Sequence, residues 1–433
     1  MFNEPRNSGF SLELRHAAYA WAKALNPIQP VISCWNGPGN NDTDLQNIHH
    51  YDANFQSLTD QSWAGLALKQ GSLVTEAGCR WFQGESSSSG SPLEMLNWAT
   101  AMKADPHTPY VPGVMLSWTV IVGNDNTRWH WGSRQGTPEP AIPWCGLIWP
   151  DGLPVSYTEA HAIAEYTRNG AKQPSAGLPR QLWAQTFLPQ TLTELRSAAY
   201  GPTFLSISSN SRTSPTAINL NSTAPADDDV LIELTIWPTW SKLSESLAVN
   251  GSEQAVGVLV HATAARLGAR PSLPQPIPAN NAAAAAVGIF AGVTADGHVI
   301  LEEWMPNDAD ITPATAQRKL LGSFDLATLP PNQEHAAVDG WNMLRLRLRR
   351  SSPVSSALSA VGGNGGAMEA SIWWNPTHAD SPGVTRGLRL NATVSGATAM
   401  NLHAAKIGDE LQLSAAVRGG ASAKIDYIGV YAV

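Results

Sequence analysis

The sequence predicts a chain in two parts, an α/β part followed by an all-β part. From residue 1 to about residue 170, strand-like and helix-like runs alternate, which is the pattern of a parallel α/β sheet or barrel. From about residue 175 onward, short β-rich runs are separated by Gly, Pro, Asn and Asp turns, as in an antiparallel β-sandwich of the jelly-roll kind. A chain of 433 residues is also too long to fold around a single ordinary hydrophobic core, so we expect two domains, over residues 1–175 and 176–433.

Five strands and four helices are expected in the first part. A strand stub at residues 1–4 leads into a helix over 12–25, which Asn26 and Pro27 end. Ser156, followed three residues later by Glu159, predicts the capped start of the last helix. The other expected strands are 31–35, 48–55, 73–76 and 114–122, and the other expected helices are 60–69, 92–103 and 156–167.

The second part is expected to contain strands throughout. Asp296-Gly297 between two apolar runs predicts a tight hairpin. Trp373 and Trp374 are adjacent in one strand and must point to opposite faces, so one can enter the core while the other is exposed. An exposed Trp there fits either glycan binding or packing. The expected strands are 230–237, 255–263, 287–293, 299–304, 341–348, 368–374, 387–394, 411–417 and 425–431.

Charge and hydropathy exclude several classes of partner. A net charge of −8 argues against nucleic-acid or anionic-membrane binding, because neutralising phosphates requires clustered Lys and Arg. The one dense basic run, residues 345–350, alternates Arg with Leu and predicts a solvated strand face. No apolar run approaches the roughly 18 residues of a membrane span, and no signal-peptide pattern precedes Asn3.

The cysteines and glycine-rich stretches predict no metal and no cofactor. Three cysteines cannot pair completely, and no Cys-x-x-Cys spacing occurs. Cys34 and Cys79 are expected in strands as small hydrophobic residues. No Gly-x-Ser-x-Gly elbow, phosphate-binding glycine loop or His-Glu-x-x-His motif is present.

Two glutamates, Glu4 and Glu76, each close a short apolar strand. Functional side chains of parallel barrels collect at the carboxyl ends of strands, and His49, Tyr51 and Trp118 fall at or near such ends too. Strand alternation puts His49 and Tyr51 on one face of their strand. Asn3-Glu4-Pro5 taken alone is more typical of a helix start, with Pro5 near the first turn.

Together, these motifs resemble the second half of a clan A glycoside hydrolase barrel, close to the cellulase-like family 5. In that clan, an Asn-Glu pair ends the fourth strand, the sixth carries His and Tyr, a Thr-Glu-x-Gly-like motif ends the seventh, and the eighth supplies a Trp. The matching segments are Asn3-Glu4-Pro5, Ile48-His49-His50-Tyr51, Thr75-Glu76-Ala77-Gly78 and Leu116-Ser117-Trp118-Thr119. The resemblance implies strands four to eight of a (β/α)8 TIM barrel and a retaining β-glycosidase.

The resemblance also implies a role for each matched residue. Glu4 would be the general acid and base, and Glu76 the nucleophile, at a carboxyl separation of roughly 5 to 5.5 Å. Tyr51 would donate a hydrogen bond to Glu76, and Asn3 would bind the sugar 2-hydroxyl. Trp118 would stack beneath the reacting sugar.

Further tryptophans are candidates for outer sugar subsites, since Trp serves both sugar stacking and burial. Trp35 ends an expected strand, while Trp129, Trp131 and Trp144 lie in the loop after the last one. Simple loop packing is the alternative role for each of them. The expected partner is a carbohydrate substrate, and the sequence does not indicate an oligomeric state.

The chain departs from a full barrel, since nothing matches the first three strands and most of the fourth. We therefore expect a truncated barrel whose full-length form is extracellular or endomembrane and whose β-sandwich resembles concanavalin-like or laminin-G-like modules. The competing hypothesis is a non-catalytic carbohydrate-binding or structural protein derived from a glycosidase.

Overall fold

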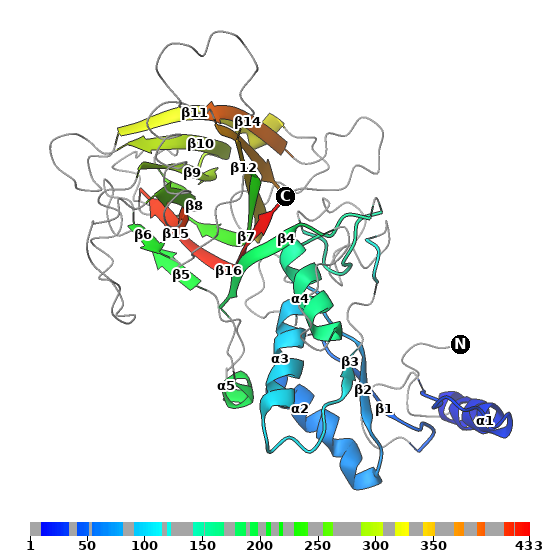
Figure 1. The fold of residues 1–433 in the computed structure, drawn as a ribbon. Helices are drawn as coiled ribbons and strands as arrows, with labels where there is room; N and C mark the ends of the chain where they lie inside the picture. The colour runs from blue at the N-terminus through cyan, green and yellow to red at the C-terminus, as the bar shows by residue number, and fades with distance from the viewer. Residues whose placement is uncertain are drawn as a thin grey trace.

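The structure is a computed structural model, and it confirms an α/β part followed by an antiparallel β-sandwich (Figure 1). The described residues are 10–33, 41–51, 54–80, 91–114, 119–122, 142–150, 152–168, 178–187, 191–197, 205–208, 216–219, 229–240, 254–262, 287–305, 317–328, 341–350, 368–375, 388–394, 411–419 and 421–433. All structural statements below concern these residues.

The α/β part is built on a parallel three-stranded sheet in the order β1-β2-β3. Its core joins Ile48 and Val74 of the sheet to Trp98 and Met102, all fully buried. The strands are β1 (Gln46–His49), β2 (Ser72–Glu76) and β3 (Gly113–Val114); the helices are α1 (Phe10–Ala24), α2 (Phe55–Ala64), the 3-10 turn η1 (Gly65–Leu68), α3 (Pro92–Ala104) and α4 (Tyr157–Thr167).

Helix α1 lies at the end of the α/β part remote from the sandwich (Figure 1). Polar contacts hold it: Arg15 Nε donates to Asp42 at 3.1 Å, and the Tyr19 hydroxyl donates to Asp44 at 2.7 Å. Trp21 of the helix is 67% exposed, and Leu25, directly after the helix, is 84% exposed, so these two apolar residues contribute little to burial.

The predicted strand at 31–35 is wrong over residues 31–33, which belong to no strand. Their backbone amides bond to side chains instead, with Val31 N donating to Asp44 Oδ2 at 2.7 Å and Ser33 N donating to Thr43 Oγ1 at 3.2 Å. The expected strand at 48–55 is shorter than predicted, because α2 begins at Phe55 with Asn54 as its N-cap. The expected strand at 1–4 lies outside the described residues.

The sandwich consists of a six-stranded sheet, β11-β10-β9-β8-β15-β6, and a seven-stranded sheet, β14-β13-β12-β7-β16-β4 with β5 on β16. One core lies between the sheets, formed by alternate apolar residues such as Ile232 and Leu344 from one and Val258 and Ile289 from the other. All nine predicted strands are present, and the predicted Asp296-Gly297 hairpin joins β9 to β10 with Gly297 at φ 83°. Trp374 is buried in this core, while Trp373 lies on the opposite face, as predicted.

The strand bounds are β4 (Arg180–Thr186), β5 (Leu205–Ser208), β6 (Thr216–Asn219), β7 (Asp229–Thr239), β8 (Ala255–Ala262), β9 (Val287–Thr294), β10 (His298–Met305), β11 (Gln317–Asp325), β12 (Asn342–Arg350), β13 (Met368–Trp374), β14 (Leu388–Val394), β15 (Leu411–Arg418) and β16 (Ser422–Ala432), with the 3-10 turn η4 (Leu326–Thr328) after β11.

The short helix α5 (Leu192–Ser197) follows β4 in the chain but packs with the α/β part. Leu192 joins the core cluster of the parallel sheet, and Arg196 Nε donates to Gln56 Oε1 on α2 at 2.7 Å. The all-β part of the chain therefore contributes a helix to the α/β part.

Candidate functional site

Glu76 lies at the carboxyl end of β2, where the parallel sheet presents its strand ends. It pairs in register with His49 of β1 after a shift between Ile48 and His49. The backbone amide of His50 donates to the Glu76 carbonyl at 2.8 Å, which fixes the two strand ends against each other. The position agrees with the expectation that functional groups gather at this edge.

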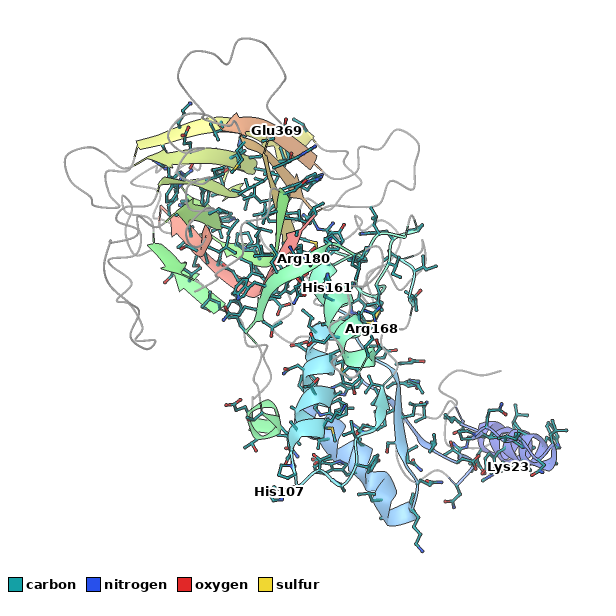
Figure 2. All side chains as sticks on the ribbon, viewed as in Figure 1. Lys23, His107, His161, Arg168, Arg180 and Glu369 are labelled. Atoms are coloured by element: carbon teal, nitrogen blue, oxygen red, sulfur yellow. A yellow bond between two sulfur atoms is a disulfide. The ribbon has the colours of Figure 1, made fainter. Side chains whose placement is uncertain are left out.

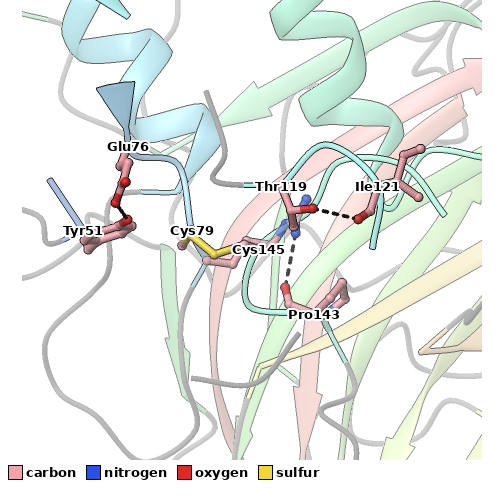
Figure 3. The surroundings of a disulfide bond; sticks show 8 residues. Tyr51, Glu76, Cys79, Thr119, Ile121, Pro143 and Cys145 are labelled. Atoms are coloured by element: carbon pink, nitrogen blue, oxygen red, sulfur yellow. Dashed lines mark hydrogen bonds between the residues drawn. A yellow bond between two sulfur atoms is a disulfide. The ribbon is translucent and has the colours of Figure 1, made fainter. Parts of the chain in front are cut away.

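Two aromatic side chains of the β1 end contact the Glu76 carboxylate. The Tyr51 hydroxyl donates to Glu76 Oε2 (Figure 3), and His49 Nδ1 lies 3.2 Å from the same oxygen. The Glu76 side chain is 15% exposed and that of His49 only 3%, so the imidazole is buried while part of the Glu76 side chain is accessible to solvent. The structure thus brings His49, Tyr51 and Glu76 together. Strand alternation predicted that His49 and Tyr51 share a face, and the bond from Tyr51 to Glu76 is the one that the resemblance implies.

A polar chain fixes the tautomer of His49. The Thr75 hydroxyl donates to Asn47 Oδ1, which leaves the Asn47 amide nitrogen facing His49 Nε2 at 3.0 Å. An amide nitrogen donates, so Nε2 accepts and the proton of a neutral imidazole lies on Nδ1, toward Glu76. Glu76 Oε2 therefore accepts a hydrogen bond from the Tyr51 phenol and faces the Nδ1 of His49 at 3.2 Å.

Behind Tyr51, a disulfide joins Cys79 to Cys145 (Figure 3). Both cysteines are fully buried in a cluster with Trp144, and the rings of Trp144 and Tyr51 lie 5.9 Å apart. The expectation that Cys79 is an unpaired hydrophobic residue is wrong. Trp144, a candidate sugar platform from sequence, is 3% exposed and packs in the protein interior.

Arg80 connects this site to α4. Its Nε donates to Glu159 Oε1 at 2.8 Å and its Nη2 bonds to the other oxygen of the same carboxylate. Both side chains are buried, and bidentate geometry is what a buried ion pair needs to offset desolvation. As predicted, the Ser156 hydroxyl caps α4. The Glu159 carboxylate, in contrast, binds the Arg80 guanidinium.

The sandwich holds the amino end of α4 through Glu233 of β7. Glu233 is fully buried and accepts hydrogen bonds from Ser156 Oγ at 2.9 Å and from the backbone amides of Tyr157 and Thr158 at 3.2 Å each. A carboxylate at this place satisfies free helix amides and complements the helix dipole. Arg345 Nε of β12 donates to the same carboxylate at 2.8 Å. The Arg345 side chain is only 11% exposed and lies in this interface, so the predicted solvated face is wrong at this position.

The same interface continues along α4 to the last strand. His161, which Figure 2 shows on α4, stacks on Tyr431 at 5.4 Å and donates from Nε2 to the Pro179 carbonyl at 2.7 Å. Burial lowers the pKa of His161. The outer face of the seven-stranded sheet is thus occupied by α4 where β7, β12 and β16 run side by side.

Two further buried acids lie where α3 meets β16. Glu94 closes the capping box of α3 with Ser91, and burial raises its pKa to about 8, with the charge of Asp426 adding to the effect. Burial raises the pKa of Asp426 to about 7, and the charge of Glu159 adds to it. Leu93 packs with Tyr427 and Met343 beside them.

Six predicted site residues lie outside the described residues. They are Asn3, Glu4, Trp35, Trp118, Trp129 and Trp131. Their roles stay predictions. Among the described residues, no group of three or more His, Cys, Asp or Glu side chains could hold a metal ion, and no helix is long and apolar enough to cross a membrane.

No protein-family model matches the chain, and no curated protein matches its sequence. Among solved structures, the metal-free carbohydrate recognition domain of Emp46p covers 53% of this chain and 88% of its own, at 10% identity and TM-score 0.27. A legume lectin-like domain from Entamoeba histolytica covers 54% and 86%, at 10% identity and TM-score 0.29. The PL-14 alginate lyase from Aplysia kurodai covers 58% and 99%, at 7% identity and TM-score 0.29. With TM-scores this low, these likenesses establish neither a family nor an activity, and the sandwich is assigned from its own sheets.

Proposed function

We propose that the chain carries the nucleophile half of a retaining β-glycosidase site, with Glu76 as the nucleophile. The observation that supports this is the partly exposed Glu76 carboxylate at a parallel strand end, bonded by Tyr51 and 3.2 Å from His49 Nδ1. Donors on one carboxylate oxygen hold the group in one orientation and leave its other oxygen to act as the nucleophile. The three parallel strands would correspond to strands six to eight of a TIM barrel.

The proposed reaction runs in two displacements. One Glu76 oxygen bonds to the anomeric carbon as the bond from that carbon to the leaving oxygen breaks, and Glu4 protonates the leaving oxygen. A water molecule, deprotonated by Glu4, then attacks the anomeric carbon and releases Glu76. Tyr51 and His49 hold the carboxylate in place through both steps.

A second candidate is carbohydrate binding without hydrolysis. A retaining mechanism needs two carboxyl groups, and Glu76 is the one carboxylate that the described residues place at these strand ends. The second candidate is favoured if Glu4 does not reach Glu76.

Covalent labelling distinguishes the two. The full chain is incubated with a panel of 2-deoxy-2-fluoro β-glycosides, which stop at the glycosyl intermediate, and Glu76-containing peptides are read by mass spectrometry. A retaining enzyme gains one sugar on Glu76, and Glu76→Gln gains none. Asp60→Asn, an exposed acid on α2, is the matched control and should label like the wild type.

A glycan array probes binding alone. Retained binding by Glu76→Gln, together with no labelling of the wild type, would support the second candidate. No labelling and no binding would contradict both.

A further inference from the structure

We infer that the Cys79–Cys145 disulfide and Arg80 form a positioning clamp for Glu76, because they press Trp144 against Tyr51. The clamp is defined by these two cysteines and Arg80. The inference rests on the proposed function only for the role of Glu76, since the contacts themselves are independent of any reaction.

Three bonds tie the β2 end to the segment around Trp144. The disulfide spans 66 positions of sequence, Arg80 N donates to the Trp144 carbonyl at 2.7 Å, and Arg80 Nη1 donates to the Pro143 carbonyl at 3.2 Å. Because the bonds flank Trp144 on both sides, they fix its backbone relative to β2.

The clamp is anchored outside the site. The Arg80 guanidinium is held by Glu159 of α4, and the amino end of α4 is held by Glu233 of the sandwich. The segment around Trp144 is therefore fixed against a scaffold larger than the three-stranded sheet.

Tyr51 is the side chain through which the clamp acts. Its ring lies tilted beside the ring of Trp144, with the ring centres 5.9 Å apart, and its hydroxyl bonds to Glu76. Turning Tyr51 to another rotamer would carry the hydroxyl away from the carboxylate, and the buried Trp144 ring opposes that turn. Tyr51 is thus held between the buried Trp144 ring and the Glu76 carboxylate that it orients.

NMR of the full chain labelled with 13Cζ-tyrosine tests this inference directly. The chain has eight tyrosines, so Tyr51→Phe identifies the Tyr51 signal and the other seven report whether a variant is folded. Glu76→Ala gives the signal of Tyr51 without its carboxylate partner. The paired variant Cys79→Ala with Cys145→Ala should move the Tyr51 signal toward that position while most other signals stay.

Trp144→Leu keeps the disulfide and should give the same shift, which covers the case in which the cysteine variant fails to fold. Trp149→Leu is the matched control, because Trp149 is 4% exposed in the same segment but packs with Val122 and Val155. An unmoved Tyr51 signal in Trp144→Leu, or an equal shift in Trp149→Leu, would overturn the inference.

Fluoroglycoside labelling adds the functional arm. Loss of the clamp should slow labelling of Glu76 by roughly ten- to a hundredfold, as expected when a reacting group is displaced by about 1 Å. A shifted Tyr51 signal in a chain whose wild type never labels would sustain the clamp and contradict the glycosidase proposal. Labelling of the wild type, together with an unmoved Tyr51 signal in the variants, would support the glycosidase proposal and contradict the clamp.

Discussion

Replacing Glu94 by Gln should remove a pH-dependent cost at the junction of α3 and β16. Gln can still accept the hydrogen bond from Ser91 N, which Glu94 Oε2 accepts at 2.7 Å, so the capping box is kept. The change therefore isolates the ionisable group. Asp426 is the second buried acid of the pair. The neighbouring Glu159 already forms an ion pair with Arg80.

The expected pH dependence follows from where the proton is held. Folding raises the pKa of Glu94 from 4.5 to about 8 and that of Asp426 from 3.8 to about 7. Between about pH 5 and 6 the unfolded chain has lost most of both protons while the folded chain keeps them, so the free energy of unfolding falls with rising pH; toward pH 7 the folded chain begins to release the Asp426 proton. Each group contributes about 1.4 kcal/mol per pH unit across this window.

While the folded chain holds both protons, the pair should lower the wild-type free energy of unfolding by roughly 3 kcal/mol per pH unit, and Glu94→Gln should show half of that slope. Between pH 5 and 7, the free energy of unfolding of the variant should rise by roughly 2 to 3 kcal/mol relative to that of the wild type. Below pH 4 the difference should level off, because Glu94 of the wild type is then protonated in both the folded and the unfolded chain.

Urea unfolding at pH 4, 5, 6 and 7, followed by tryptophan fluorescence, measures the difference. Glu13→Gln, an exposed substitution on α1, is the matched control and should stay within about 0.5 kcal/mol of wild type at every pH. If the Glu94→Gln and wild-type curves run parallel across this range, the folded protein does not hold the proton and the reasoning is refuted.

Three further outcomes are expected. Glu233→Ala leaves Arg345 buried without its carboxylate and should cost about 3–5 kcal/mol in urea unfolding, whereas Glu233→Gln should cost less. Removing the disulfide between Cys79 and Cys145, which spans 66 positions, should cost about 4 kcal/mol of unfolding free energy by loop entropy, and a cost near zero would show that the bond does not form. In a secretory host Asn41, exposed in the motif Asn-Asp-Thr, should carry an N-glycan that glycosidase digestion and mass spectrometry detect, and Asn41→Gln should lack it.

The strands of the sandwich core were predictable because their alternation is strong. Residues 368–374 match β13 at both ends, since Ala370, Ile372 and Trp374 enter the core at alternate positions. Strand β11 was not predicted. Its sequence, Gln-Arg-Lys-Leu-Leu-Gly-Ser-Phe-Asp, shows no period of two, and it lies at the edge of its sheet, where pairing with β10 makes it a strand.

The site was predictable only in part. Strand alternation and strand-end positions brought His49, Tyr51 and Glu76 together in advance. The disulfide could not be predicted, because a count of three cysteines gives no pairing and a separation of 66 positions carries no local signal. Trp144 was therefore considered as an exposed platform, whereas the disulfide draws its segment into the interior.

Arg345 shows why the role of the sandwich could not be predicted from the sequence. An alternating Arg-Leu strand has the same pattern whether its polar face meets water or a second layer of protein. The deciding partner is Glu233, which pairs in register with Arg345 on the adjacent strand and caps a helix 75 to 77 positions away in the chain. Because this helix lies against β7, β12 and β16 on the outer sheet face and also holds Arg80 through Glu159, the sandwich supports the Glu76 site, and a glycan cannot bind to the part of this face that α4 covers.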